Sequence, residues 1–311
     1  MAQNLKSEGF PKIVVAIPCY NESITIEKVV DDFRGVLPGA EIWVFDNNSS
    51  DDSAHLAENA GAKVHKVRRQ GKGYVLQAIF NQISADAIVL VDGDDTYFAE
   101  DVTRLLNPVL SGEADMVVGN RLHSAVDENM RAHRQIGNRL IVSSINLMFG
   151  TEYQDILSGY RVFNRRFVEA VPLLTSGFET ETEMTLQALE EGMVIDEIPI
   201  SYRSRPADSH SKLNAFRDGY RIMLTAAILL RDHNPLRVFG LISILLLFGG
   251  FALLILVIIA SKGVVDINMT AVLTAAVFLL PLSALAFSLG LILNAINTRF
   301  RQLKQILHRN K

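Results

Sequence analysis

The sequence predicts an α/β domain with a mostly parallel sheet, followed by helices at a membrane surface and a two-helix transmembrane hairpin. Up to about residue 120, apolar β-branched runs alternate with helical patterns, which is the order of elements in an open α/β sheet. Residues 236–260 and 270–296 then form two long apolar runs. An amphipathic segment, residues 213–234, lies directly before them.

The predicted strands are short, continuous apolar runs. Residues 13–18 (IVVAIP), 42–46 (IWVFD) and 87–92 (AIVLVD) are rich in β-branched side chains, which is typical of strands buried on both faces of a parallel sheet. Further strands are expected at residues 115–119 and 194–200.

Helical patterns separate these strands. In residues 22–36, apolar side chains recur three or four positions apart, and residues 72–83 and 100–110 show the same period. That period places the apolar side chains on one face of a helix. Strands and helices that alternate in this way predict crossover connections between parallel strands.

The membrane hairpin is predicted from length and charge. Residues 236–260 contain one charge, Arg237 at their edge, and residues 270–296 contain none. Each run is long enough to cross a hydrocarbon core of about 30 Å as a helix. A hydrophobic hairpin inside a soluble core is the alternative, and it is disfavoured because neither run has a polar face. We therefore expect two transmembrane helices within residues 235–297.

The flanking segments predict the topology. Residues 213–234 are expected to form an amphipathic helix on the membrane surface, although an ordinary domain helix stays possible. Residues 298–311 are basic, and the positive-inside bias places this tail in the cytoplasm. Residues 1–212 would form a cytoplasmic domain. Both termini are then cytoplasmic, at a cell or ER-type membrane.

Composition excludes some classes of protein. The net charge is −4, which gives no sign of a nucleic-acid partner. Cys19 is the only cysteine, so the chain cannot form an intrachain disulfide. Gly249 and Gly250 suit close helix packing, either within the hairpin or between copies, so a homo-oligomer stays open.

Acidic residues follow the first three predicted strands, in the segments 18–22, 46–51 and 92–95. Ligands of open α/β sheets bind beyond the carboxyl ends of the strands. Asp92 and Asp94 are two positions apart, so in an extended chain their side chains point the same way. Two such carboxylates can hold Mg²⁺ or Mn²⁺ while a substrate diphosphate supplies further oxygens.

Six motifs occur in order along the chain: P-x-Y-N-E at 18–22, D-x-x-S-x-D at 46–51, D-G-D-D at 92–95, G-N-R at 119–121, D-x-x-S-G-Y-R at 155–161 and S-K-L at 211–213. With these motifs the chain resembles the family 2 glycosyltransferases over most of residues 11–215. Within that family it is most similar to the polyprenyl-phosphate glycosyltransferases, the group that includes dolichol-phosphate mannose synthase. The resemblance implies a GT-A fold, which is a Rossmann-like, mostly parallel sheet.

The resemblance also implies roles at the nucleotide-sugar. Pro18, Tyr20 and Glu22 would line the nucleotide pocket, and Asp46 would accept hydrogen bonds from the base. Asp92 and Asp94 would hold the metal beside the ribose and the diphosphate. The resemblance also implies that the loop of the S-K-L motif folds over the diphosphate, where Ser211 and Lys212 would contact it.

Basic residues offer further phosphate contacts. Lys72 lies in a glycine-bearing turn before a predicted helix, where its side chain and backbone N–H groups could meet phosphates; a solvated turn is an equal alternative. Arg121, Arg131 and Arg134 are candidates for the acceptor phosphate, because arginine binds phosphate in bidentate geometry. Arg131 and Arg134 could equally be solvated.

Asp155 precedes the S-G-Y-R motif, and the resemblance makes it a base candidate near the acceptor. The second pKa of a phosphate monoester is about 6, so the acceptor needs little deprotonation, and Asp155 could instead position the acceptor or a cation. The predicted catalytic set comprises Asp155, Asp94, Arg121 and Lys212.

The predicted reaction is an inverting transfer of a hexose from a UDP- or GDP-sugar to a polyprenyl phosphate, such as undecaprenyl or dolichyl phosphate. A polysaccharide synthase with a non-lipid acceptor is one alternative. Such enzymes usually carry a Q-x-x-R-W element, whereas the only tryptophan here is Trp43, in a predicted strand. A catalytically inactive nucleotide-sugar binder is another. The sugar and the base of the nucleotide are not predicted.

Overall fold

The computed structural model describes residues 11–122, 142–206 (apart from 144, 148 and 178), 224, 228, 231, 234–262 and 268–309. The chain divides into two compact units, Met1–Thr225 and Ala226–Lys311. The predicted interfacial helix, residues 213–234, lies almost entirely outside the described residues.

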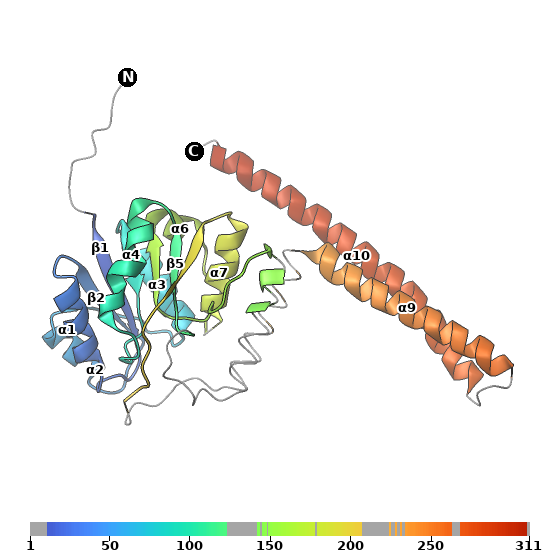
Figure 1. Cartoon of the computed structure of the whole chain (residues 1–311), viewed down its shortest axis with the longest axis horizontal. Coiled ribbons are helices and arrows are strands. Elements are labelled where there is room, and N and C mark those ends of the chain that lie inside the picture. The colour runs from blue at the N-terminus through green and yellow to red at the C-terminus, as the bar shows by residue number, and fades with distance from the viewer. Residues whose placement is uncertain are drawn as a thin grey trace, which may run out of the picture. The chain divides into compact units, whose positions relative to one another are not determined.

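The first unit is built on a mixed sheet of seven strands in the order β3-β2-β1-β4-β6-β5-β7 (Figure 1). Only β6 runs antiparallel to its neighbours, β4 and β5; the other pairs are parallel. The strands are β1 (Ile13–Cys19), β2 (Glu41–Asp46), β3 (Lys63–Lys66), β4 (Ala87–Leu90), β5 (Met116–Asn120), β6 (Arg161–Asn164) and β7 (Ile195–Pro199).

The five strands expected from apolar runs are present, and β3 and β6 are additional. Strand β3 (KVHK) lies at the edge of the sheet and has exposed lysines at both ends, so it lacks the continuous apolar run of a central strand. Strand β6 (RVFN) is short and begins with the buried Arg161. Neither pattern is typical of a buried strand.

Helices cover both faces of the sheet (Figure 1). In β1, Val15 and Ile17 join one core cluster with helices α1 and α4, whereas Val14 and Ala16 join the other with α3 and α7, as the twofold period of a strand requires. The helices are α1 (Ile26–Val36), α2 (Ser53–Asn59), α3 (Lys72–Gln82), η1 (Ala99–Asp101), α4 (Val102–Ser111), α6 (Arg165–Ala170) and α7 (Thr180–Glu190).

Helix α1 begins at Ile26, four residues later than the apolar period predicts. Residues 22–25 form a turn instead, in which the Glu22 carbonyl accepts hydrogen bonds from the N–H groups of Thr25 and Ile26. Asn21 lies before it in a left-handed conformation, with φ of 51°, and its Oδ1 atom accepts from the Ser50 N–H at 2.8 Å. The turn brings the P-x-Y-N-E motif to the sheet edge where the other acidic motifs end.

The second unit is a helical hairpin of α9 (Pro235–Ser261) and α10 (Met269–Arg309). Both helices are long and apolar enough to cross a membrane, with mean hydropathies of 3.1 and 2.4 over Pro235–Ser261 and Met269–Phe300. Helix α10 extends past residue 297, the predicted start of the basic tail, to Arg309.

Small and polar residues join α9 to α10. The Ser283 hydroxyl donates to the Ser243 carbonyl at 3.0 Å, and both serines are buried. A Cβ at Gly250 would lie 2.9 Å from the Leu280 Cδ2 atom, so glycine permits this approach. Most other side chains of the hairpin are exposed and apolar, as suits a surface in contact with lipid rather than water.

Candidate active site

The acidic motifs meet at the carboxyl edge of the sheet. Asp46 is the last residue of β2, and residues 92–95 follow β4 after Val91. Glu22 reaches the same place from the loop after β1, because a Cβ at Gly93 would lie 2.5 Å from the Glu22 Oε2 atom. The Thr25 hydroxyl donates to the Gly93 carbonyl at 2.7 Å. These contacts hold the two loops together.

Asp92 pairs with a buried ammonium. The Lys72 Nζ atom lies 2.6 Å from Asp92 Oδ1 and 2.7 Å from Glu181 Oε1. Burial alone would lower the pKa of Lys72, but the two carboxylates outweigh it and raise that pKa above its ordinary value. A Cβ at Gly159 would lie 2.9 Å from the Asp92 Cγ atom, so glycine is required for the backbone to approach this carboxylate.

Two arginines from the segment after β7 lie against the other acids of the D-G-D-D motif. Arg205 forms an ion pair with Asp94, and Arg203 with Asp95. The Thr96 hydroxyl also donates to Asp94 Oδ1 at 2.6 Å. Burial and the charge of Asp92 raise the pKa of Asp94. The edge of the sheet therefore balances carboxylates with cations of the chain itself.

The donor set suits a hard divalent cation. Within residues 11–122 and 142–206, no three histidine, cysteine or acidic side chains cluster tightly enough to hold a metal. Asp92 and Asp94 alone would supply two oxygens, and Mg²⁺ is commonly bound by one or two carboxylates together with substrate phosphates. Lys72 and Arg205 already lie against these carboxylates, so a metal ion bound here would share or replace these contacts.

The loop after β2 has a structural role at Asn47. Its side chain donates to the carbonyls of Val67 and Arg69 and accepts from the Gly71 N–H at 2.8 Å. Asp46 Oδ1 accepts from the Ser49 N–H at 3.3 Å. Asn47 therefore fixes the segment that leads into α3, and Asp46 is the acid of this motif at the sheet edge.

The turn before α3 uses the N–H groups of its two glycines within the chain. The Gly71 N–H donates to Asn47, and the Gly73 N–H donates to the Ser176 carbonyl at 3.1 Å. A Cβ at Gly73 would lie 2.7 Å from Ser176 Cα, so the two segments are in close contact. From this turn, the Lys72 side chain reaches the acidic edge.

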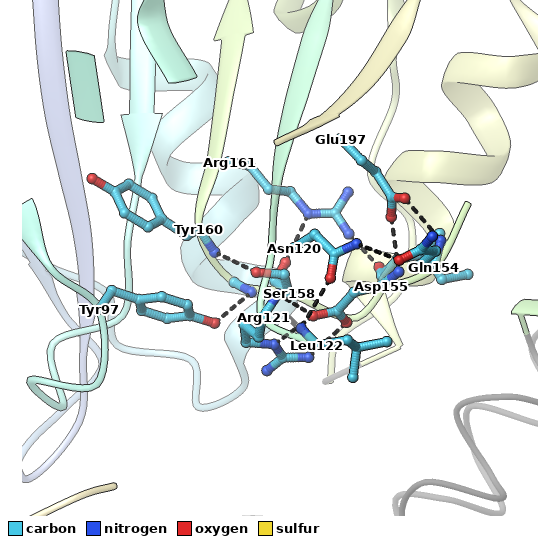
Figure 2. Close-up of polar contacts among 12 residues, drawn as sticks. Tyr97, Asn120, Arg121, Leu122, Gln154, Asp155, Ser158, Tyr160, Arg161 and Glu197 are labelled. Atoms are coloured by element: carbon cyan, nitrogen blue, oxygen red, sulfur yellow. Dashed lines mark hydrogen bonds and ion pairs between the residues drawn. The ribbon is translucent and has the colours of Figure 1, made fainter. Parts of the chain in front are cut away.

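Asp155 and Arg121 form a bidentate ion pair (Figure 2). Asp155 Oδ2 accepts from the Arg121 Nε at 2.7 Å and from its backbone N–H at 3.1 Å, and Oδ1 accepts from Nη2 at 2.8 Å. Asp155 is fully buried, and the Arg121 side chain is 24% exposed. Burial raises the pKa of Asp155, but the Arg121 charge and hydrogen bonds outweigh it and lower that pKa.

Three neighbours hold this pair in place (Figure 2). Asn120 donates to the Gln154 Oε1 atom at 3.2 Å. Glu197 in β7 accepts from the N–H groups of Gln154 and Asp155, each at 2.8 Å. Arg161 is fully buried and donates to the carbonyls of Ile156 and Ser158. Burial raises the pKa of Glu197 despite its two backbone hydrogen bonds.

The structure brings most of the predicted site residues to one edge of the sheet. Pro18 lies buried in β1, and Tyr20 follows it, half-buried. Four predicted residues lie outside the described residues: Arg131, Arg134, Ser211 and Lys212. Two glutamates were missed, Glu181 and Glu197. Each looks solvated in the sequence, and only the E-T-E-T-E pattern at 179–183 marks one of them as unusual.

Comparison with known proteins shows which family of sequences this chain resembles. Residues 14–171 match the model of glycosyl transferase family 2. The glycosyltransferase AglJ of Haloferax volcanii is 36% identical over 229 residues, 73% of this chain and 75% of the relative. A dolichyl-phosphate hexose transferase of the same organism is 27% identical over 213 residues, 68% of this chain and 91% of the relative.

Among solved structures, a glucosyl-3-phosphoglycerate synthase from Mycobacterium tuberculosis in complex with Mn²⁺ and UDP-glucose has a TM-score of 0.58 and 23% identity. The alignment covers 70% of this chain and 79% of that one, so it supports the GT-A-like sheet. Sequence and fold agree, and the chain belongs to glycosyl transferase family 2.

Proposed function

We propose that this protein transfers a hexose from a nucleotide-sugar to the phosphate of a polyprenyl phosphate lipid. The observation that carries the proposal is the arrangement of Arg121, held by Asp155 at the same sheet edge as Asp92 and Asp94. A phosphate-binding cation beside a donor site suits an acceptor that is itself a phosphate. The dolichyl-phosphate hexose transferase named above supports the same acceptor class.

On the donor side, Asp92 and Asp94 face the ribose and the diphosphate, and Pro18, Tyr20, Glu22 and Asp46 line the nucleotide pocket. Lys72 keeps Asp92 ionised, since its ammonium lies 2.6 Å from that carboxylate. Ser211 and Lys212 contact the diphosphate. Asp92 and Asp94 would hold Mg²⁺ or Mn²⁺, which would neutralise charge on the departing diphosphate. The Mn²⁺ of the structural neighbour supports this part of the proposal.

On the acceptor side, Arg121 binds the lipid phosphate, joined by Arg131 and Arg134. One phosphate oxygen attacks the anomeric carbon, the bond from that carbon to the diphosphate breaks, and the nucleoside diphosphate leaves. A phosphate monoester with a second pKa of about 6 is largely a dianion at neutral pH. Asp155 then serves to orient Arg121, since both of its oxygens already accept hydrogen bonds from that arginine.

The hairpin α9–α10 would anchor the enzyme beside its lipid. In this proposal residues 1–212 form the cytoplasmic domain, residues 213–234 an interfacial helix, and residues 235–297 two spans, with both termini in the cytoplasm of a cell or ER-type membrane. The apolar exposed surface of both helices supports it. Holding both substrates at one membrane surface favours reaction by proximity.

The test uses the full chain in detergent with Mg²⁺ or Mn²⁺, a panel of UDP- and GDP-hexoses and a short polyprenyl phosphate. Detection of the lipid by mass should reveal a glycosyl phosphoryl lipid with one donor, and none with Asp94→Asn. Transfer to a soluble saccharide alone would favour the synthase-like alternative. Nucleotide binding without any product would favour an inactive binder.

A further inference from the structure

Glu197 occupies a place that the transfer chemistry leaves unassigned. Its carboxylate accepts hydrogen bonds from two successive backbone N–H groups, Gln154 to Oε2 and Asp155 to Oε1, both at 2.8 Å (Figure 2). The residue is half-buried in β7. A carboxylate with one N–H on each oxygen fixes the direction of the peptide that follows.

The sheet explains how Glu197 reaches this loop. Strands β5 and β7 are parallel neighbours, with Val118 opposite Glu197, and Arg121 follows the end of β5 by one residue. The loop that carries Asp155 lies across both strand ends. Asp155 is therefore held at two points, its N–H by β7 and its carboxylate by the residue after β5.

We propose that Glu197 is a positioning residue for the acceptor phosphate, which fixes the Asp155 backbone so that Asp155 can present Arg121 to that phosphate. The inference rests on the proposed function, in which Arg121 binds the lipid phosphate. Glu197 itself contacts neither substrate. The residue acts through two hydrogen-bonded steps, Glu197 to Asp155 and Asp155 to Arg121.

A carboxylate is needed at this position. Two N–H groups point at Glu197, and an amide has only one acceptor oxygen. In Glu197→Gln, either the Gln154 or the Asp155 N–H would face the amide NH₂, although the side chain keeps its size. The substitution therefore removes one of the two hydrogen bonds that hold the loop to β7. Glu197→Asp keeps both oxygens on a shorter side chain. Its KM for the acceptor should therefore lie between those of the wild type and Glu197→Gln.

The experiment measures KM for a short prenyl phosphate and for the nucleotide-sugar, using the full chain in detergent. Glu197→Gln should raise the acceptor KM about tenfold, the effect of losing one backbone hydrogen bond to a charged group, while the donor KM changes less than about twofold. Asp196→Asn, the exposed neighbour in β7, is the matched control and should behave as the wild type. An unchanged acceptor KM, or an equal rise in both KM values, would overturn the proposal.

A second measurement does not depend on the transfer reaction. The Nε–H resonance of Arg121 can be assigned in ¹⁵N-arginine-labelled protein by its loss in Arg121→Lys. Because that N–H donates to Asp155 at 2.7 Å, it should exchange slowly with solvent. Glu197→Gln should shift the resonance and speed its exchange at least about tenfold. An unchanged resonance would refute the positioning role, even if the acceptor proves not to be a lipid phosphate.

Discussion

Asp155→Asn separates two roles that the sequence left open, a general base and a residue that orients Arg121. The carboxylate is fully buried and accepts three hydrogen bonds from Arg121, at 2.7, 2.8 and 3.1 Å. Breaking a buried ion pair by removing one charge costs about 3–5 kcal/mol. Asparagine keeps the shape and one acceptor, so we expect a loss near the lower end, about 3 kcal/mol.

Thermal unfolding of the full chain in detergent measures this loss. A penalty of about 3 kcal/mol corresponds to a fall in Tm of roughly 6–12 °C for a domain of this size. Because the pKa of Asp155 is lowered in the folded protein, its charge stabilises the fold above the ordinary carboxyl pKa of about 3.9. The stability difference between Asp155→Asn and the wild type should therefore be largest near pH 7 and shrink as the pH falls below about 4.

Kinetics then distinguish the two roles. If Asp155 orients Arg121, the substitution should raise the acceptor KM at least about tenfold, with the donor KM unchanged. Loss of a general base would instead lower kcat by about 10²–10⁴ at an unchanged acceptor KM, and that result would refute the orienting role. If Asp155→Asn loses less than about 1 kcal/mol of stability, as exposed ion pairs do, that result would contradict a buried ion pair between Asp155 and Arg121. Asp196→Asn serves as the exposed control.

Three further substitutions test other parts of the structure. Gly159→Ala should weaken nucleotide binding at least about tenfold in a Mn²⁺-dependent titration, because its Cβ would lie 2.9 Å from Asp92 Cγ; wild-type affinity would contradict this packing. Lys72→Met should destabilise the protein by about 3–5 kcal/mol, since it removes the cation between two carboxylates. Chemical denaturation measures this loss, and an unchanged free energy of unfolding would contradict the role of Lys72 in balancing the two charges. Gly250→Val should lower the Tm of the hairpin, measured by far-UV circular dichroism, because a Cβ would lie 2.9 Å from Leu280 Cδ2. Gly240→Val is the control, since a Cβ at that position would have nothing within 4 Å. Equal effects of the two substitutions would exclude this contact.

Much of the sheet was predictable because central strands carry their own signal. The apolar runs in β1, β2 and β4 are buried on both faces, so their composition alone reveals them. Strand β3 lies at the edge, where polar residues are tolerated, and β6 owes its burial to both neighbours. Such strands are set by pairing rather than by local sequence.

The site was predictable as a set of acids but not as a network. Asp92 and Asp94 follow a buried strand, so topology places them. The partners come from distant segments: Glu181 reaches Lys72 from α7, and Glu197 reaches Asp155 from β7. A glutamate in a sequence is usually solvated, and only tertiary contacts reveal that Glu181 pairs with Lys72 and that Glu197 binds the Asp155 loop.

The measurement that tests the central claim most directly identifies both products of a single turnover. The full chain is mixed with a nucleoside diphosphate sugar and a short polyprenyl phosphate, and the lipid and the nucleotide are analysed by mass. Attack by the lipid phosphate on the anomeric carbon predicts a polyprenyl monophosphate sugar and one equivalent of nucleoside diphosphate, both absent with Asp94→Asn. A polyprenyl diphosphate sugar with nucleoside monophosphate would mean phosphoryl transfer, and would contradict the account.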